Sequence, residues 1–182
     1  MKFPSLSYLT PHSIEEAVAL LKKHGADARL LSGGQSLMPM LAFRLASCSM
    51  LVDLKLIPGL DGITITEDGV ELGAKVRWRD IEHDARLTAA HPLLSIAVKH
   101  IAHYAIRNRG TVGGSLAHGD PASELPALAV ACDAMIEIEG PAGRRSLPAG
   151  GFFLSPLITA LATDEIIVSL RFPPWPKARA EK

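Results

Sequence analysis

The sequence has 182 residues, of which 48% are hydrophobic and 21% charged, the composition of a globular protein with enough apolar side chains for a core. Lysine plus arginine and aspartate plus glutamate number 19 each, so the formal net charge is zero. This balance argues against a general nucleic-acid-binding or membrane-surface protein. Two cysteines without paired spacing exclude a CxxC zinc site and a four-cysteine iron–sulfur cluster within the sequence.

No targeting or membrane segment is visible. The start, Met1-Lys2-Phe3-Pro4, is not followed by the apolar segment of a signal peptide, and no run approaches the roughly 20 apolar residues of a membrane span. We therefore expect a cytoplasmic protein. In that compartment we expect Cys48 and Cys132 to be buried free thiols, and a disulfide between them is the alternative.

The first fifty or so residues predict a small β-α-β unit. The expected elements are a helix over 14–24, strands over 28–31 and 50–54, and a short helix or turn over 37–45. Ser13 and Glu16 form a capping box at the start of the helix, and Gly25 follows its basic last turn. Pro39 is expected to interrupt the segment over 37–45.

A second, strand-rich part follows the junction at Pro58-Gly59. Glu67-Asp68-Gly69 is a good hairpin turn between strands over 63–66 and 70–72. The further expected elements are helices over 78–84, 92–104 and 123–132, and strands over 134–139, 144–147 and 165–172.

Two glycine-rich turns are the most informative feature, Ser32-Gly33-Gly34-Gln35-Ser36 and Thr111-Val112-Gly113-Gly114-Ser115. Glycine lets the backbone approach a bulky ligand, and free N–H groups in such turns hold phosphate. Each turn alone is also explained as a tight corner; together they predict two halves of one anion cradle and a diphosphate-containing cofactor. Neither is a Walker loop or a GxGxxG fingerprint, so the architecture must be a different one.

Other patterns are weaker. His100 and His103 share a helix face without a third ligand at an obvious spacing, so no metal site is expected. The segment around Ser115 lacks the final glycine of a nucleophile elbow. Asp120 and Glu124 are four residues apart and are read either as a carboxylate pair or as helix caps.

Taken together, these segments resemble the flavin-binding medium subunit of the molybdenum hydroxylases, the family of carbon monoxide dehydrogenase, xanthine dehydrogenase and aldehyde oxidase. Residues 32–41 (SGGQSLMPML) and 107–127 (RNRGTVGGSLAHGDPASELPA) carry the resemblance. The opening YLTP at 8–11 and the closing DEIIVSLRFP at 164–173 match as well. The resemblance spans nearly the whole sequence.

The family implies an α+β, two-lobed FAD-binding fold of the vanillyl-alcohol-oxidase-like type. Residues 1–56 are expected to form the small β-α-β lobe, residues 57–176 a larger lobe with a mixed or antiparallel sheet and helices, and residues 177–182 a tail. FAD is expected to lie extended between the lobes. Family members continue into a further C-terminal domain, which this sequence does not contain.

The resemblance also implies which residues contact FAD. Both glycine turns are expected at the diphosphate and its neighbours, Asp120 and Glu124 near the ribose and adenine half, and Ile167 near the flavin ring. The full expected set is Ser32, Gly33, Gly34, Gln35, Ser36, Leu37, Thr111, Val112, Gly113, Gly114, Ser115, Asp120, Glu124 and Ile167. No catalytic side chain and no metal ligand is expected.

Four of these positions depart from the usual family pattern. Ser32 replaces alanine, Gln35 replaces histidine or threonine, Ser115 replaces asparagine and Glu124 replaces aspartate. The shorter Ser115 side chain is expected to lose one hydrogen bond, and Glu124 is longer by one methylene. None of these changes by itself abolishes binding.

The implied function is electron transfer within a multi-subunit oxidoreductase. A large partner subunit would carry the molybdenum cofactor, and a small one would carry [2Fe-2S] clusters whose electrons reach the FAD and leave to an acceptor. The expected assembly is a heterotrimer, with its dimerisation left open. Two alternatives remain: an assembly module that has lost its cofactor, and a stand-alone flavin reductase or oxidase.

Overall fold

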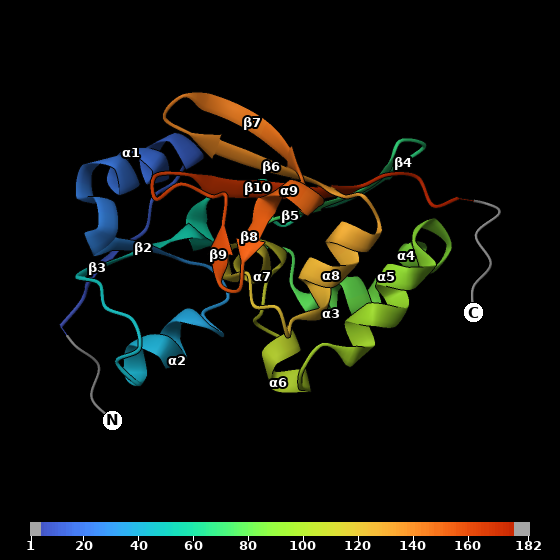
Figure 1. Cartoon of the computed structure of the whole chain (residues 1–182), viewed down its shortest axis with the longest axis horizontal. Helices are drawn as coiled ribbons and strands as arrows, with labels where there is room; N and C mark the ends of the chain where they lie inside the picture. Colours follow the sequence, from blue (N-terminus) through green and yellow to red (C-terminus); the bar gives the residue numbers. More distant parts are fainter. Residues whose placement is uncertain (1–4, 177–182) are drawn as a thin grey trace.

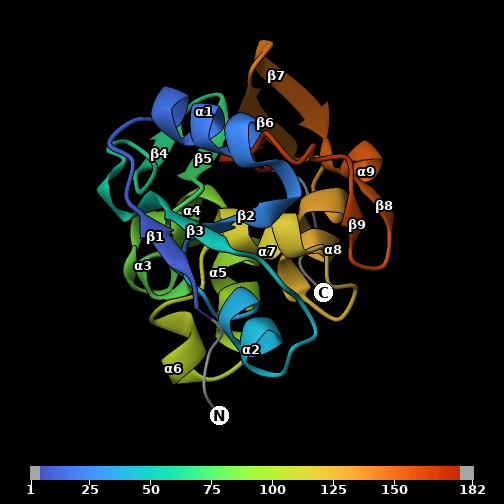
Figure 2. The same ribbon diagram turned by 90° about the vertical axis from the view of Figure 1, so that its left-hand side faces the viewer.

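Two β-sheets organise the chain, and helices lie around and between them (Figures 1 and 2). The computed structural model describes residues 5–176, so the expected tail at 177–182 and the first four residues lie outside it. One sheet has three strands and the other five, and a separate two-stranded hairpin completes the set. The structure has the expected α+β character.

The small sheet is parallel, in the order β1-β3-β2. Its strands are β1 (Ser7–Leu9), β2 (Ala28–Leu31) and β3 (Met50–Asp53). Helix α1 (Ile14–His24) connects the first two and buries Ala17, Val18 and Leu21. The β-α-β unit is thus confirmed, while the three-residue strand β1 was not predicted because it is too short to show an alternating pattern.

The start of α1 differs from the expected capping box in one detail. The Ser13 hydroxyl accepts a hydrogen bond from the Glu16 N–H, at 3.1 Å. The Glu16 carboxylate in turn accepts from the N–H of His12, at 2.8 Å, instead of from Ser13. Gly25 ends the helix with a φ of +53°, as the sequence predicts.

Helix α2 (Leu37–Ala42) forms despite Pro39. The expectation of an interruption is wrong because Pro39 is the third residue of the helix, where a backbone N–H has no partner within the helix. The N–H of Phe43 donates to the Pro39 carbonyl at 2.9 Å, which closes the last turn.

The larger sheet is antiparallel throughout, in the order β4-β5-β10-β6-β7. Its strands are β4 (Ile63–Thr66), β5 (Gly69–Gly73), β6 (Met135–Gly140), β7 (Gly143–Pro148) and β10 (Ile166–Phe172). Strand β10 is last in the chain but central in the sheet, so the two hairpins β4–β5 and β6–β7 are joined only through it. This confirms the expected antiparallel sheet.

The helices of the second part cover one face of this sheet (Figure 1). They are α3 (Trp78–His83), α4 (Arg86–Ala90), α5 (Pro92–Ala97), α6 (Tyr104–Arg107), α7 (Val112–His118), α8 (Glu124–Ala131) and α9 (Ala149–Phe152). The hairpin of β8 (Phe153–Ser155) and β9 (Ile158–Thr159) lies beside them. Helices α4, α6, α7 and α9 and this hairpin, all short, were not predicted.

The single helix expected over 92–104 is wrong. Helix α5 passes into a short 3-10 turn at Val98–His100, and the chain then reverses before α6. Ala102 adopts a φ of +43°, which no helix contains. The turn places Ile101 in the core, at 7% exposure, and a continuous helix would not.

Two hydrophobic clusters form the core. The larger one lies between the five-stranded sheet and its helices and includes Phe152 and Phe172. The smaller one packs α1 against the three-stranded sheet, and it also contains Ile57, Leu60 and Ile166. Residues from both parts of the chain therefore complete the smaller cluster, and the lobe boundary after residue 56 stays a prediction.

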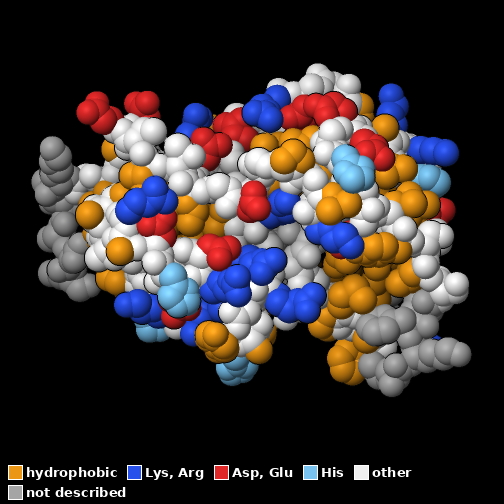
Figure 3. Space-filling view, turned by 180° about the vertical axis from the view of Figure 1, so that it is seen from behind, with side chains coloured by type: hydrophobic (Ala, Val, Ile, Leu, Met, Phe, Trp, Pro, Cys, Tyr) orange, Lys and Arg blue, Asp and Glu red, His pale blue; other side chains and the backbone are white. Residues whose placement is uncertain are grey.

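The surface carries mixed charges. Lys and Arg side chains gather in the middle of the face shown in Figure 3, with hydrophobic side chains toward one end. Of the two cysteines, Cys132 is buried and Cys48 is half-buried. Within residues 5–176, no helix combines the length and apolar character needed to cross a bilayer.

The ion pair of Arg145 and Glu165 links β7 to the residues before β10. Arg145 donates to both carboxylate oxygens of Glu165 at 2.6 Å, and also to the Ala160 carbonyl. The hydrogen bonds from Arg145 lower the pKa of Glu165 below its usual value, against the opposing effect of burial. The folded state thus binds fewer protons at this carboxyl than the unfolded state, which stabilises the fold at and above the ordinary carboxyl pKa.

We predict that Glu165→Gln costs about 1–2 kcal/mol of unfolding free energy at pH 7, because it removes a charge-assisted bidentate pair that is partly screened by solvent. The wild-type advantage should disappear as the pH falls below about 4.5 and through the lowered pKa of Glu165. Urea unfolding between pH 3 and 7 measures both effects. Glu139→Gln, which breaks a more exposed pair with Arg144, is the control and should change stability by less; an equal loss from the two variants would contradict the prediction.

Candidate cofactor site

The first glycine motif follows directly from strand β2 and leads into α2. Gly34 has a φ of +72°, which favours glycine at this position. The Gln35 side chain folds back and donates to the Gly33 carbonyl at 3.2 Å. Among residues 5–176, the N–H groups of Gly33, Gly34, Gln35 and Ser36 donate no hydrogen bond. The first motif therefore presents the free backbone donors that the sequence predicts.

The second motif is the first turn of helix α7, and its backbone is used differently. The Thr111 hydroxyl accepts from the Gly114 N–H at 3.3 Å and caps the helix. The N–H groups of Val112 and Gly113 donate to the carbonyls of Val76 and Ala74, and that of Ser115 donates to Thr111. The expectation of free N–H groups is thus wrong for Val112–Ser115, where local helix formation and packing against β5 use them.

Gly113 is a packing residue. A Cβ atom built on it would lie 2.7 Å from the Cβ of Ala74, so only glycine lets α7 approach the strand end this closely. Gly114 is different: a Cβ there would meet the Thr111 hydroxyl at 2.9 Å. The helix start therefore depends on two glycines for two separate reasons.

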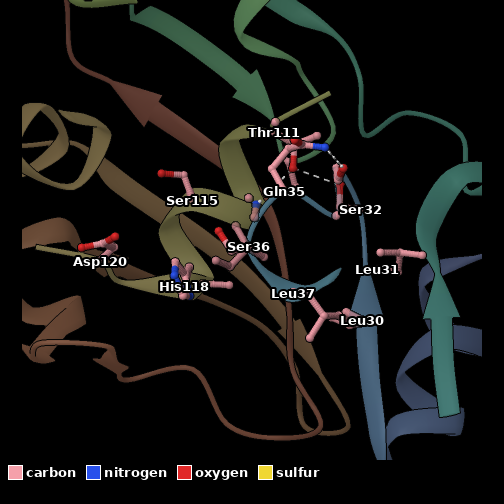
Figure 4. A pocket seen from close by; sticks show the side chains of 18 of the residues that line it. Leu30, Leu31, Ser32, Gln35, Ser36, Leu37, Thr111, Ser115, His118 and Asp120 are labelled. Atoms are coloured by element: carbon pink, nitrogen blue, oxygen red, sulfur yellow. Dashed lines mark hydrogen bonds between the residues drawn. The ribbon is translucent and has the colours of Figure 1, made fainter. Parts of the chain in front are cut away.

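The two motifs touch each other, although they are 79 residues apart. The Thr111 hydroxyl donates to the Ser32 hydroxyl at 3.0 Å. Gly33 packs on the backbone before the second motif, so that an added Cβ would lie 2.2 Å from the Arg109 carbonyl oxygen. The contact places both motifs at one point between the two sheets, as Figure 4 shows.

A cavity of about 700 Å³ opens at this point, which we call the cofactor cavity. All of the expected site residues line it except Val112: Ser32, Gly33, Gly34, Gln35, Ser36, Leu37, Thr111, Gly113, Gly114, Ser115, Asp120, Glu124 and Ile167. Val112 is buried in the larger core instead. Its side chain points away because it lies on the face of α7 opposite to the cavity.

Several lining residues were missed by the sequence analysis. They come from β2, α2, α3, the segment around α6 and the residues up to the start of β10, and include Arg29, Leu31, Met40, Trp78, Ile101, Ala102, Ile106, Leu161 and Ile166. All of them except Arg29 are apolar, and most lie outside the segments that carry the family resemblance. Only their position at the ends of elements brings them together, so no local signal marks them.

Arg107 holds the segment that forms one wall of the cavity. Its guanidinium donates to Glu82 at 3.0 Å and to the carbonyls of Ile101 and Ala102, both at 3.1 Å. Ala102 is the residue with positive φ, a conformation that persists only where surrounding contacts hold it. Arg107 thus fixes the reversal that turns Ile101 and Ala102 toward the cavity.

Carboxylates outnumber cations at the cavity wall. Asp120, Glu124 and Glu165 line it, with Arg29 and His118. Asp120 accepts from the Ala122 N–H at 2.9 Å, which stabilises the turn before α8, and the hydroxyls of Ser115 and Ser123 lie 3.0 Å apart. Asp120 is therefore a turn residue and a cavity residue at once, and the N-cap position of α8 is held by Ser123.

The arrangement suits a long ligand with a polar middle. Free N–H groups and hydroxyls lie where the motifs meet, and apolar side chains such as Leu31, Leu37 and Ile167 extend away from them. A dinucleotide has this character, with a diphosphate between two aromatic ends. The residues present thus fit FAD.

Comparison with known proteins places the chain in a family. The family described as "FAD binding domain in molybdopterin dehydrogenase" matches residues 3–175. The chain belongs to this family. The resemblance seen in the sequence is confirmed, and the expected cofactor, FAD, is the one that the family description names.

Relatives and solved structures agree. The chain is 45% identical over 170 residues to the carbon monoxide dehydrogenase medium chain of Hydrogenophaga pseudoflava, covering 93% of this chain and 59% of the relative. It is 42% identical over 176 residues to the nicotine 6-hydroxylase medium subunit of Paenarthrobacter nicotinovorans, covering 97% and 62%. These relatives are subunits of oxidoreductases.

Among solved structures, carbon monoxide dehydrogenase from Hydrogenophaga pseudoflava superposes with a TM-score of 0.94 at 44% identity, covering 97% of this chain and 62% of that one. Quinoline 2-oxidoreductase from Pseudomonas putida 86 gives 0.91 at 40% identity, covering 95% and 60%. The expected fold is confirmed. The chain spans about 60% of the length of the relatives it matches.

We predict that Gly33→Ala destabilises the fold by about 1–3 kcal/mol, because the new methyl group would overlap the Arg109 carbonyl and push the two motifs apart. Urea unfolding measures this. Gly150→Ala is the matched control, since a Cβ there meets no atom within 4 Å. Equal stability of the Gly33 variant and the wild type would show that the motifs are not tightly packed.

Proposed function

We propose that the chain holds FAD in the cofactor cavity and serves as the flavin-bearing, electron-transferring part of a multi-subunit molybdenum hydroxylase. One observation carries the proposal: the two motifs, 79 residues apart, are hydrogen-bonded to each other and line one cavity. If each motif were only a tight backbone turn, the two would not be expected to hydrogen-bond to each other and line the same cavity. The identity of the relatives as medium subunits supports the same function.

We assign the FAD diphosphate to the meeting point of the motifs. The free N–H groups of Gly33 to Ser36 are the backbone donors for phosphate oxygens. Ser32 adds a hydroxyl, since its oxygen accepts from Thr111 and its own hydrogen is free to donate. The first motif thus supplies most donors, and the second holds it in place.

The two ends of FAD follow from the remaining lining. Asp120 and Glu124 are carboxylates suited to accept hydrogen bonds from ribose hydroxyls, and we place the adenosine half on their side. Leu37 and Ile167 are apolar and lie with the motifs on the cavity wall, and we place the flavin ring near them. Burial of the ring against such side chains excludes water from it.

The redox chemistry belongs to the bound flavin, which exchanges one or two electrons when it is present. The protein's own residues bind it, orient it and shield it from water. No lining residue is required to act as an acid or base in this role. The sequence has only two cysteines, too few to hold an iron–sulfur cluster, so the electron donor would be a cluster in a partner subunit.

We propose the partners accordingly: a small subunit with [2Fe-2S] clusters and a large subunit with the molybdenum cofactor. The relatives are named as the medium chain, the medium subunit or the beta subunit of dehydrogenases and a hydroxylase. The substrates in their names range from carbon monoxide to caffeine, so the substrate is set elsewhere in the complex.

We predict that the purified chain binds about one FAD per molecule, and that riboflavin and FMN bind at least about tenfold more weakly because both lack the diphosphate and the adenosine half. Titration monitored by flavin fluorescence and absorbance measures the affinities.

No binding at excess FAD would contradict the proposal and favour the cofactor-free assembly module. Equal affinity for riboflavin would contradict the assignment of the diphosphate to the motifs. Oxidation of NADH by the FAD-loaded chain without partners would instead favour the stand-alone reductase.

We predict that Arg107→Met weakens FAD binding about tenfold, because the loss of its hydrogen bonds to Ile101 and Ala102 releases one wall of the cavity. Arg107→Lys keeps the positive charge but loses the forked set of guanidinium donors, so its FAD affinity should lie between those of the wild type and Arg107→Met. FAD titration and urea unfolding of the cofactor-free chain are measured together.

Arg144→Met is the control for this series, since the Arg144 guanidinium pairs with Glu139 on the outer strands and, within residues 5–176, hydrogen-bonds to no other residue. A loss of stability without any loss of FAD affinity in the Arg107 variants would show that the guanidinium supports the fold and not the cavity.

A further inference from the structure

A second cavity, of about 540 Å³, shares a wall with the cofactor cavity. Ser32, Gly33 and Thr111 line both cavities, so the joined motifs separate them. We call the second cavity the basic cleft, defined by its five cationic lining residues Lys55, Lys75, Arg77, Arg79 and Arg109. They come from the segment after β3, from the connection between β5 and α3, from α3 itself and from the residues before α7.

Two of these cations are free to bind a ligand. Lys75 donates to the carbonyls of Lys55 and Ile57, Lys55 to the Tyr8 hydroxyl, and Arg79 pairs with Asp80. The guanidiniums of Arg77 and Arg109, by contrast, form no hydrogen bond or ion pair with any residue of the range 5–176.

The carboxylates of the cleft do not cancel this charge. Asp53, Asp61 and Asp80 line it, so five cations face three acids. Asp53 is buried and accepts from the Tyr8 hydroxyl and the Lys55 N–H. Asp80 accepts from the Arg77 N–H, at 3.1 Å, at the start of α3. Only Asp61 lacks a partner in the described residues, and the cleft keeps a positive balance.

We propose that the basic cleft binds a small phosphate-bearing anion, separate from FAD. Arginine guanidiniums form paired hydrogen bonds with phosphate oxygens. In this cleft, Arg77 and Arg109 are the two arginines whose guanidinium N–H donors are not used within residues 5–176. A concave site of this volume suits a small molecule better than the flat surface of a protein partner.

The basic cleft lies next to the cofactor cavity, so an anion bound there would affect FAD binding. An anion in the basic cleft and the diphosphate of FAD would lie on opposite sides of the same motifs, because Ser32, Gly33 and Thr111 belong to both walls. Binding in either cavity therefore acts on the affinity of the other, and by linkage the two effects are equal. Two anions repel, so FAD should weaken anion binding without abolishing it.

The test is a calorimetric titration of the FAD-loaded chain with pyrophosphate, with inorganic phosphate and ADP as further probes. FAD fills the cofactor cavity and keeps the probe out of it. We expect saturable binding near one pyrophosphate per chain that weakens with added salt. The double variant Arg77→Gln/Arg109→Gln should lose about tenfold or more in affinity, since two charge-assisted contacts are removed. Binding of ADP but not of inorganic phosphate would mark the ligand as a nucleotide.

Arg144→Gln is the matched control, because Arg144 is an exposed arginine on β7 whose one ion-pair partner in the described part of the chain is Glu139. This variant should bind pyrophosphate like the wild type. Thermal melts check that the double variant is folded, which is expected because neither guanidinium forms a hydrogen bond or an ion pair with any of residues 5–176. Absence of saturable binding, equal binding by the double variant, or displacement of pyrophosphate by stoichiometric FAD would each overturn the proposal.

The outcome is independent of the proposed function. If the chain fails to bind FAD, the proposed function fails, and the same comparison of wild type, double variant and control on the cofactor-free chain still decides the anion site. If FAD binds and pyrophosphate does not, only the anion site is lost, and the basic cleft would then be a candidate surface for an acidic protein.

Discussion

The contact between the two glycine motifs is the constraint on which the site depends. Gly33 lies so close to the Arg109 carbonyl that no side chain fits between them, and the Thr111 hydroxyl bonds to Ser32 across this contact. Every other wall of the cofactor cavity is arranged around the point so created. The residues of this contact, Ser32, Gly33 and Thr111, line both the cofactor cavity and the basic cleft.

Elements from both sheets hold the two glycine motifs in contact. Strand β2 of the parallel sheet ends at the first motif, and the antiparallel bridge of Arg77 with Thr111 fixes the start of the second. Strand β10 then ties the parts together, because it is central in the larger sheet while Ile166, its first residue, packs into the core of the smaller one. Strand β10, the last strand in the chain, thus links the two parts that carry the motifs.

The two glycine motifs have similar sequences but different roles: the first has free backbone N–H groups, and in the second these groups are already hydrogen-bonded. The first keeps free N–H groups because the chain leaves a strand and turns before α2 begins. In the second, the equivalent groups are used by helix α7 and by the end of β5. One motif is therefore available to a ligand and the other holds it, a division that follows from which elements flank each Gly-Gly pair.

The sequence by itself determined the elements with strong local signals and the identity of most site residues. Capping at Ser13, the hairpin turn before Gly69 and the two Gly-Gly pairs are all decided by neighbouring residues, and the motifs were enough to indicate the family. Tertiary structure decided what local signals cannot carry: the break at Ala102, held by Arg107; the turning of Val112 into the core; and the apolar walls from Trp78 to Ile166. The reason is that these features depend on contacts between residues far apart in the chain, whose free energies outweigh local propensity and leave no periodic pattern in the sequence.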